Sequence, residues 1–319
     1  MTDLEFVAME NSTTVRSQRH SRLLPLIRTG TRALSILAPA LAGRLAERWF
    51  LTPPRPRRPA AEIALLGTAQ ARPIYVGARR IETWRWGVGP SVLLVHGWGG
   101  RGSQLGSFVG PLVRQGFSVV TFDAPGHGAS SAGIVTVPEI IGAIRAVAGS
   151  REPLAGLIAH SLGATAAVRA LYEGLASGAV VLIAPPADLA GPAVWFTEAL
   201  GFSRAARDGM HRRIEARVGL PWSAFDVATL APALTAPLLV VHDRDDAEVP
   251  WQDGTVITRA WPGAEILMTG GLGHRRILRD PDVVATGVAF LTARAAERGL
   301  AVTADEDPRA APIEILMAR

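Results

Sequence analysis

The chain has 319 residues, of which 48% are apolar, so it can bury a sizeable core and its composition argues against extensive disorder. It contains no Cys, which excludes disulfides, thiol catalysis and cysteine-based metal sites. Its 33 basic residues are all Arg and leave a net charge of only +5, concentrated in residues 1–60, so we expect no nucleic-acid binding.

Residues 1–60 are expected to form an N-terminal helical arm that ends in a linker. Within residues 31–50, four side chains recur close to helical spacing: Leu34, Leu37, Leu41 and Leu45. This periodicity predicts a helix, with a kink at Pro39. We expect its apolar face to dock on the main body, with peripheral membrane contact as the alternative. The linker over residues 52–60 is rich in Pro and Arg and should be stiff.

The start of the chain does not resemble a secretory signal, because the stretch from Met1 to Glu5 is acidic rather than basic. No apolar run reaches the roughly 18 residues that a membrane-spanning helix needs. We therefore expect a cytoplasmic protein, with secretion left open as the alternative.

From residue 61 onwards, strands and helices alternate. Short and mostly continuous apolar runs predict strands over residues 81–86, 91–95, 118–122, 154–159, 179–183, 237–241 and 264–268. Helices are predicted between them, over residues 103–115, 137–148, 162–175 and 281–298. This alternation predicts an α/β fold with a doubly wound, mostly parallel sheet. The core would span 61–184 and 235–300, the insertion 185–234 would form a small helical cap, and 301–319 would be a C-terminal tail.

The pentapeptide A-H-S-L-G, residues 159–163, lies where a predicted strand gives way to a helix. Small residues at its two ends permit a sharp turn that exposes Ser161, as a nucleophile requires. The backbone N–H of Leu162 is then the expected first donor to an oxyanion. The structural alternative is that Ser161 only caps the helix that follows it.

Two glycine-rich segments follow the preceding strands. In H-G-W-G-G-R-G, residues 96–102, the backbone N–H of Trp98 is the expected second oxyanion donor, and the segment does not match a phosphate-binding loop. In F-D-A-P-G-H-G-A-S, residues 122–130, we interpret Asp123 and His127 as structural residues of a turn.

The acid and the base of a catalytic triad should follow the serine along the chain. The segment V-H-D-R-D-D-A-E-V-P, residues 241–250, offers Asp246 as the acid, with Asp243 or Asp245 as alternatives. Glycines before His274 give its loop the freedom to reach Ser161, so His274 is the expected base. No metal and no cofactor are expected.

These motifs together resemble those of the α/β-hydrolase superfamily, over about residues 70–300. The resemblance implies a carboxylesterase-like serine hydrolase that cleaves small-molecule esters of small or medium acyl chains through an acyl-enzyme intermediate. Aromatic residues of the insertion are candidates for the substrate pocket: Trp195, Phe196 and Trp222.

Three other functions stay open at this stage. The same triad could serve an acyltransferase, or a thioesterase, lactonase or amidase, because the motifs do not specify the acceptor or the bond cleaved. A scaffold that binds a ligand without turnover is a further alternative, since the fold by itself does not determine function.

Overall fold

The computed structural model describes residues 24–149 and 153–300. These residues divide into two compact units. We call residues 24–51 with Ala190–Pro221 the helical unit, and the remaining described residues the core unit. The predicted C-terminal tail, 301–319, lies outside the described residues.

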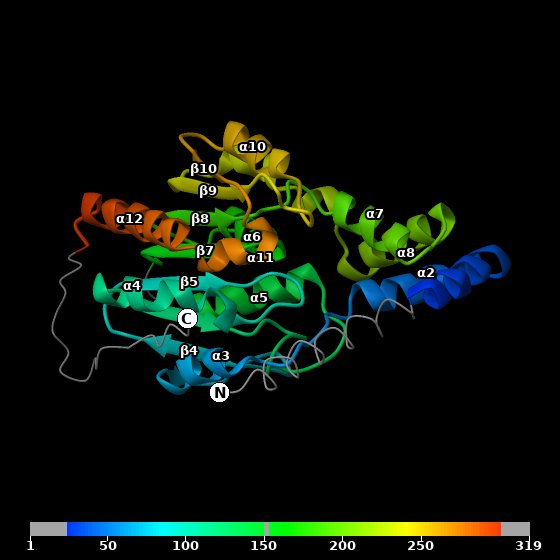
Figure 1. Ribbon diagram of the computed structural model, residues 1–319, viewed down its shortest axis with the longest axis horizontal. Coiled ribbons are helices and arrows are strands. Elements are labelled where there is room, and N and C mark those ends of the chain that lie inside the picture. Colours follow the sequence, from blue (N-terminus) through cyan, green and yellow to red (C-terminus); the bar gives the residue numbers. More distant parts are fainter. Residues whose placement is uncertain (1–23, 150–152, 301–319) are drawn as a thin grey trace, which may run out of the picture. The chain divides into compact units, whose positions relative to one another are not determined.

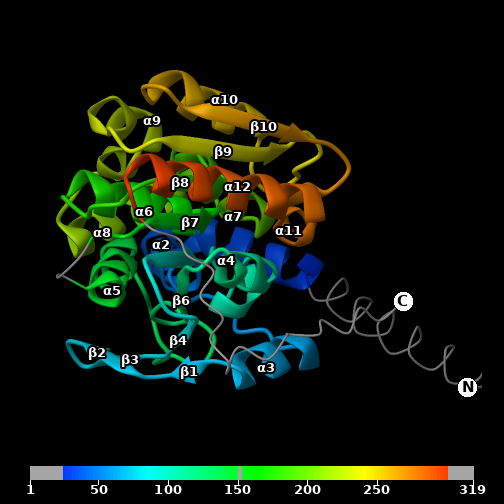
Figure 2. The same ribbon diagram turned by 90° about the vertical axis from the view of Figure 1, so that its left-hand side faces the viewer.

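The core unit is built on an eight-stranded sheet with the order β1-β4-β6-β5-β7-β8-β9-β10, which Figure 2 shows from β1 near the bottom to β10 near the top. Its strands are β1 (Gln70–Ala71), β4 (Thr83–Trp86), β5 (Ser91–Val95), β6 (Ser118–Phe122), β7 (Gly156–His160), β8 (Val180–Ile183), β9 (Leu238–Asp243) and β10 (Glu265–Thr269). In this sheet order, the strands from β6 to β10, including β5, pair in parallel with their neighbours. Strand β4 pairs antiparallel with both β6 and β1. The predicted α/β fold with a doubly wound, mostly parallel sheet is confirmed.

The central strands are mostly apolar because both faces of the sheet are covered. Every residue of β6, β7, β8 and β9 is buried, which is why these strands lack polar alternation in the sequence. One predicted strand, 81–86, is divided in the structure. Its first residue ends β3 (Arg79–Ile81), which pairs with β2 (Ile74–Val76) in a separate hairpin, and its last four form β4.

Helices of the core unit connect the strands (Figure 1). They are α3 (Ala60–Gly67), α4 (Val109–Arg114), α5 (Val137–Ala148), α6 (Leu162–Tyr172), α9 (Val227–Leu230), α10 (Trp251–Ala260), α11 (Gly273–Arg276) and α12 (Pro281–Glu297), with short 3₁₀ helices at Gly102–Phe108, Trp222–Phe225, Ala231–Ala233 and Ile277–Arg279. Helix α12 begins where the sequence predicts, because Asp280 accepts hydrogen bonds from two first-turn N–H groups and a proline follows it.

The helical unit contains a helix over residues 24–37, α2 (Pro39–Phe50), α7 (Ala190–Ala199) and α8 (Arg204–Val218). Helix α2 packs against α8 through small residues: a Cβ on Gly43 would lie 3.2 Å from the carbonyl oxygen of Ala206. Glu47, buried on the same face, accepts hydrogen bonds from Arg213 and Arg217 at 2.5 and 2.9 Å. The N-terminal arm and part of the inserted segment thus share one unit.

The buried face of these first helices differs from the predicted one. Buried positions on α2 are Ala42, Gly43, Ala46 and Glu47, whereas Leu37 and Leu41 of the predicted apolar face are exposed. The physical reason is that small side chains let two helix backbones approach closely, which leucines at the same positions would prevent. The chain also breaks at Ala38, so that Pro39 begins a new helix instead of kinking one.

Among the residues that the structure describes, no helix is both long enough and apolar enough to cross a bilayer.

Candidate active site

Ser161 occupies a strained turn between β7 and α6. Its φ and ψ are 53° and −129°, and in the described part of the chain Ala184 is the other non-glycine residue with positive φ. A residue with a Cβ adopts this conformation at a cost, so the surrounding structure must hold it in place. The N–H of Ser161 donates to the carbonyl of Ile183 in the neighbouring strand at 3.0 Å.

Two glycines make room for this turn. A Cβ on Gly163 would lie 2.4 Å from the carbonyl oxygen of His96, and one on Gly97 would lie 2.9 Å from the Cβ of Ser161. No side chain larger than hydrogen fits at either position without a shift of the backbone. The small-residue pattern around the serine therefore reflects the close approach of the 96–102 loop to the turn.

The helix-capping explanation for Ser161 does not account for its hydroxyl. Ser161 stands at the N-cap of α6, yet its side chain makes no capping hydrogen bond. Ser203, at the N-cap of α8, does accept such a bond from the N–H of Ala206 at 3.2 Å. The backbone N–H of Leu162, as the first residue of α6, has no intrahelical acceptor by its position in the helix.

His274 and Asp246 form a hydrogen-bonded pair. Nδ1 of His274 donates to Oδ2 of Asp246 at 2.7 Å, and Oδ1 of the same carboxylate accepts from the N–H groups of Glu248 and Val249 at 2.8 and 2.9 Å. Burial by itself raises the pKa of the Asp246 carboxyl, but these hydrogen bonds outweigh burial and hold the pKa below its ordinary value. The carboxylate is therefore ionised at neutral pH and fixes the orientation of the imidazole.

The other two candidate acids serve the loop that carries His274. Asp243 accepts hydrogen bonds from the hydroxyl of Thr269 at 2.7 Å and from the N–H of Leu272 at 3.1 Å. Asp245 accepts from the N–H of Gly271 at 2.7 Å. The structure thus brings Asp246 to His274 and uses its two neighbours to shape the loop.

His160 ties the serine turn to the histidine loop. Its Nε2 lies 3.0 Å from the carbonyl oxygen of His274, and the two rings are 4.6 Å apart between centroids. Burial, followed by the charge on His274, lowers the pKa of His160 to about 3, so it is a neutral donor to that carbonyl. Because His160 directly precedes Ser161, this bond holds the two segments at one edge of the sheet.

His96 organises the glycine-rich loop. Its Nε2 accepts from the N–H of Ala124 at 2.9 Å, and its Nδ1 therefore carries the proton and donates to the carbonyl of Gly97 at 2.7 Å. Burial lowers its pKa, which keeps the ring neutral in this role. Trp98, the residue after Gly97, packs edge-on against His127, with ring centroids 5.2 Å apart.

Asp123 is a structural residue of the adjoining turn. Its buried carboxylate accepts from the N–H of Gly102 at 2.9 Å, from the N–H of Ala129 at 2.7 Å and from the Arg58 guanidinium at 2.7 Å. His127 instead lies 2.8 Å from the carbonyl of Pro125. Asp123 therefore joins the two glycine-rich loops to the linker.

The linker and α3 support the glycine-rich loop in a way that the sequence did not indicate. A Cβ on Gly99 would lie 2.8 Å from Cγ of Pro54, so the linker packs directly on the loop. Glu62 on α3 accepts from Nε and a terminal nitrogen of Arg101 at 2.5 and 2.8 Å, and from the hydroxyl of Ser103 at 2.6 Å. The sequence signal was weak because these partners are some forty positions apart and match no motif.

The candidate pocket residues fall in different units. Trp195 and Phe196 belong to the helical unit, where the ring of Phe196 lies 5.2 Å from that of Phe50, and Trp222 belongs to the core unit. No group of three or more His, Asp or Glu side chains in the described chain is arranged to hold a metal ion.

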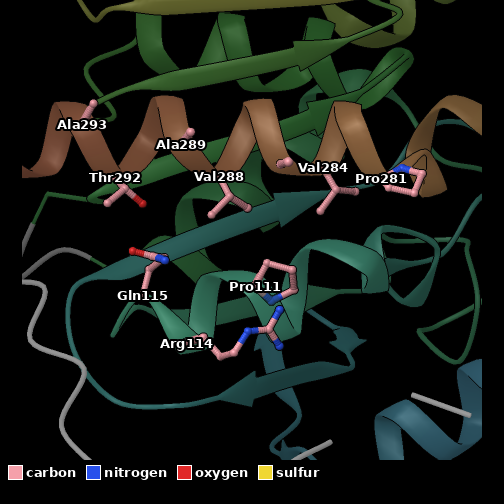
Figure 3. Close-up of a pocket in the computed structure, with 10 residues that line it drawn as sticks. Pro111, Arg114, Gln115, Pro281, Val284, Val288, Ala289, Thr292 and Ala293 are labelled. Atoms are coloured by element: carbon pink, nitrogen blue, oxygen red, sulfur yellow. The ribbon is translucent and has the colours of Figure 1, made fainter. Parts of the chain in front are cut away.

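A separate groove of about 700 Å³ runs between α4 and α12 (Figure 3). It is lined by Pro111, Arg114, Gln115, Pro281, Val284, Ala285, Val288, Ala289, Thr292 and Ala293. None of the residues expected to take part in catalysis lines this groove.

Comparison with known proteins places the chain in a family. The sheet order and the turn after a central strand define a hydrolase-type α/β protein, and a model described as the alpha/beta hydrolase family matches residues 92–287, more than half of the chain. The chain therefore belongs to the alpha/beta hydrolase family.

Individual relatives are more distant. The chain is 32% identical over 103 residues to the "Putative carbamate hydrolase RutD" of Stutzerimonas stutzeri (strain A1501), which covers 28% of this chain and 36% of the relative. It is 27% identical over 235 residues to the 2-hydroxy-6-oxo-6-phenylhexa-2,4-dienoate hydrolase of Burkholderia cepacia, covering 59% of this chain and 82% of the relative. The match thus spans about a third of the first relative and most of the second.

Among solved structures, a "putative lipase" from Acinetobacter baumannii AYE superposes with a TM-score of 0.60 at 16% identity, covering 76% of this chain and 99% of its own. At this identity the likeness concerns the fold alone.

Proposed function

We propose that the protein is a serine hydrolase that cleaves carboxylic esters of small or medium acyl chains. The observation that carries the proposal is the 2.7 Å hydrogen bond from His274 to Asp246, made on a loop that His160 fastens to the turn bearing Ser161. With Nδ1 committed to the carboxylate, Nε2 of the imidazole is the nitrogen left to take a proton from a hydroxyl.

The reaction would proceed in two steps. Nε2 of His274 removes the proton of the Ser161 hydroxyl while Oγ of Ser161 attacks the ester carbonyl. The same proton then passes from His274 to the leaving alcohol. In the second step, His274 takes a proton from water as the water oxygen attacks the acyl carbonyl, and it returns this proton to the Ser161 oxygen as the acyl–serine bond breaks and the acid leaves. Throughout, Asp246 stabilises the imidazolium and remains ionised.

The backbone N–H groups of Trp98 and Leu162 would stabilise the negative oxygen of each tetrahedral intermediate. Gly97 lies against the Cβ of Ser161, which supports the placement of the Trp98 amide beside the reacting carbon. Loss of one oxyanion donor in comparable sites raises the activation free energy by about 3–4 kcal/mol. Trp222, which belongs to the same unit as Ser161, would contribute an apolar surface for the acyl or alcohol group.

The test is hydrolysis of p-nitrophenyl butyrate by the full chain and by Ser161→Ala. We expect the variant to lose activity by roughly a thousandfold or more while it remains folded. Ser223→Ala, an exposed serine of the core unit, is the matched control and should retain full activity. Equal rates for Ser161→Ala and the unaltered chain would show that Ser161 is not the nucleophile. Thioester, lactone and amide substrates, each with and without an alcohol acceptor, would define the bond cleaved and the acceptor.

A further inference from the structure

The first two helices of the helical unit carry an exposed apolar row. Four aliphatic side chains form it: Leu26, Ile36, Leu37 and Leu41, with exposed fractions of 69%, 79%, 83% and 52%. Leu26 and Leu37 are about three helical turns apart and so lie on the same side of their helix. On α2, Leu41 lies outside the surface that packs on α8, because that contact is made through Gly43 and its small neighbours.

The exposed charges on these two helices have one sign. Arg32 and Arg44 are exposed on the same two helices. The single acidic residue between positions 24 and 51 is Glu47, which is buried and paired with Arg213 and Arg217. Long aliphatic chains flanked by arginines, without an exposed carboxylate, are the pattern of a helix that lies in a membrane interface.

We propose that the apolar row docks the protein peripherally on a membrane surface that contains anionic lipid. The aliphatic side chains would enter the boundary between headgroups and acyl chains, and the arginines would contact lipid phosphates. A lipid surface fits better than a protein partner because the exposed face offers aliphatic groups and arginines, but neither carboxylates nor amides for directional pairing. This inference goes beyond the proposed function and does not rest on it.

Vesicle binding by the full chain tests the proposal. Co-sedimentation would compare vesicles of pure phosphatidylcholine with vesicles that contain about 30% phosphatidylglycerol, with the expected preference for the anionic vesicles. The double change Ile36→Glu and Leu37→Glu should lower the affinity for anionic vesicles by roughly tenfold or more. Val88→Glu is the matched control, because Val88 is 68% exposed on the core unit, and it should bind as the unaltered chain does.

The arginines are tested separately. Arg32→Gln with Arg44→Gln should remove most of the preference for anionic vesicles, whereas Arg259→Gln, an exposed arginine of the core unit, should not. Melting temperature and hydrolysis of a soluble ester show whether each variant is folded, and the binding readout does not depend on catalysis.

Three results would overturn the proposal. The unaltered chain could fail to bind either kind of vesicle, or the Glu double variant could bind as tightly as the unaltered chain. The third is a dimer of the unaltered chain that ignores vesicles and that Ile36→Glu with Leu37→Glu converts to a monomer, which would make the apolar row an interface between two copies.

Discussion

Replacement of Ser161 by glycine should stabilise the protein relative to replacement by alanine. Alanine keeps the Cβ and therefore keeps the strain of the positive φ, whereas glycine has no Cβ and adopts this conformation readily. The side chain of Ser161 makes no capping hydrogen bond, so neither variant loses one. We expect this result if the fold holds the Ser161 backbone in a strained conformation for catalysis. We do not expect it if Ser161 serves only as a helix cap.

The magnitude follows from two opposing effects. Relief of a strained backbone conformation contributes about 1–3 kcal/mol, and the greater entropy of glycine in the unfolded chain offsets about 0.5–1 kcal/mol of it. The expected net difference between Ser161→Gly and Ser161→Ala is about 1 kcal/mol, or about 2–4 °C in melting temperature for a unit of this size.

The assay is urea denaturation with calorimetry, applied to both variants. Ser203→Gly provides the matched control, because that serine caps α8 at an ordinary φ of −74° and its replacement removes a real hydrogen bond. We expect the control to be destabilised. If Ser161→Gly proves less stable than Ser161→Ala, the strained turn is not a feature of the folded protein and the reasoning fails.

Three further predictions can be checked on the same material. Asp246→Asn should lower kcat for ester hydrolysis by roughly 10⁴-fold with little change in stability, because the amide no longer fixes the productive tautomer of the imidazole; a loss under tenfold would contradict this role. Gly163→Ala should destabilise the chain by about 1–3 kcal/mol, since its Cβ would lie 2.4 Å from a backbone oxygen, whereas Gly142→Ala on α5, with its nearest neighbour at 3.9 Å, should be neutral or stabilising in the same denaturation assay. Stability should fall as the pH drops below about 6.5, because burial lowers the pKa of His160 and of His127 to about 3 and the unfolded chain then binds more protons than the folded one. Each imidazole should account for about 2 kcal/mol between pH 7 and pH 5, and an unchanged urea midpoint over that range would refute this.

The local sequence predicted strands β4 to β10 of the core unit and the order of its polar residues, but not helices α3 and α10. Strands over 91–95 and 118–122 and the helix over 137–148 have the predicted bounds. Strands covered on both faces are mostly apolar, so their positions can be predicted without knowledge of the partner strands. Asp246 and His274 were chosen from the serine–acid–histidine order along the chain, with Asp243 and Asp245 as alternative acids.

Tertiary structure alone decided which groups support the site and which helix face is buried. The bond between Glu62 and Arg101, and that between His160 and the carbonyl of His274, join segments with no spacing rule between them. For α2, hydrophobic periodicity pointed to the leucines, but packing used Gly43 and its small neighbours. Periodicity records the apolar character of each residue, whereas burial depends on how closely two backbones can approach, and that distance exists only once both helices are folded.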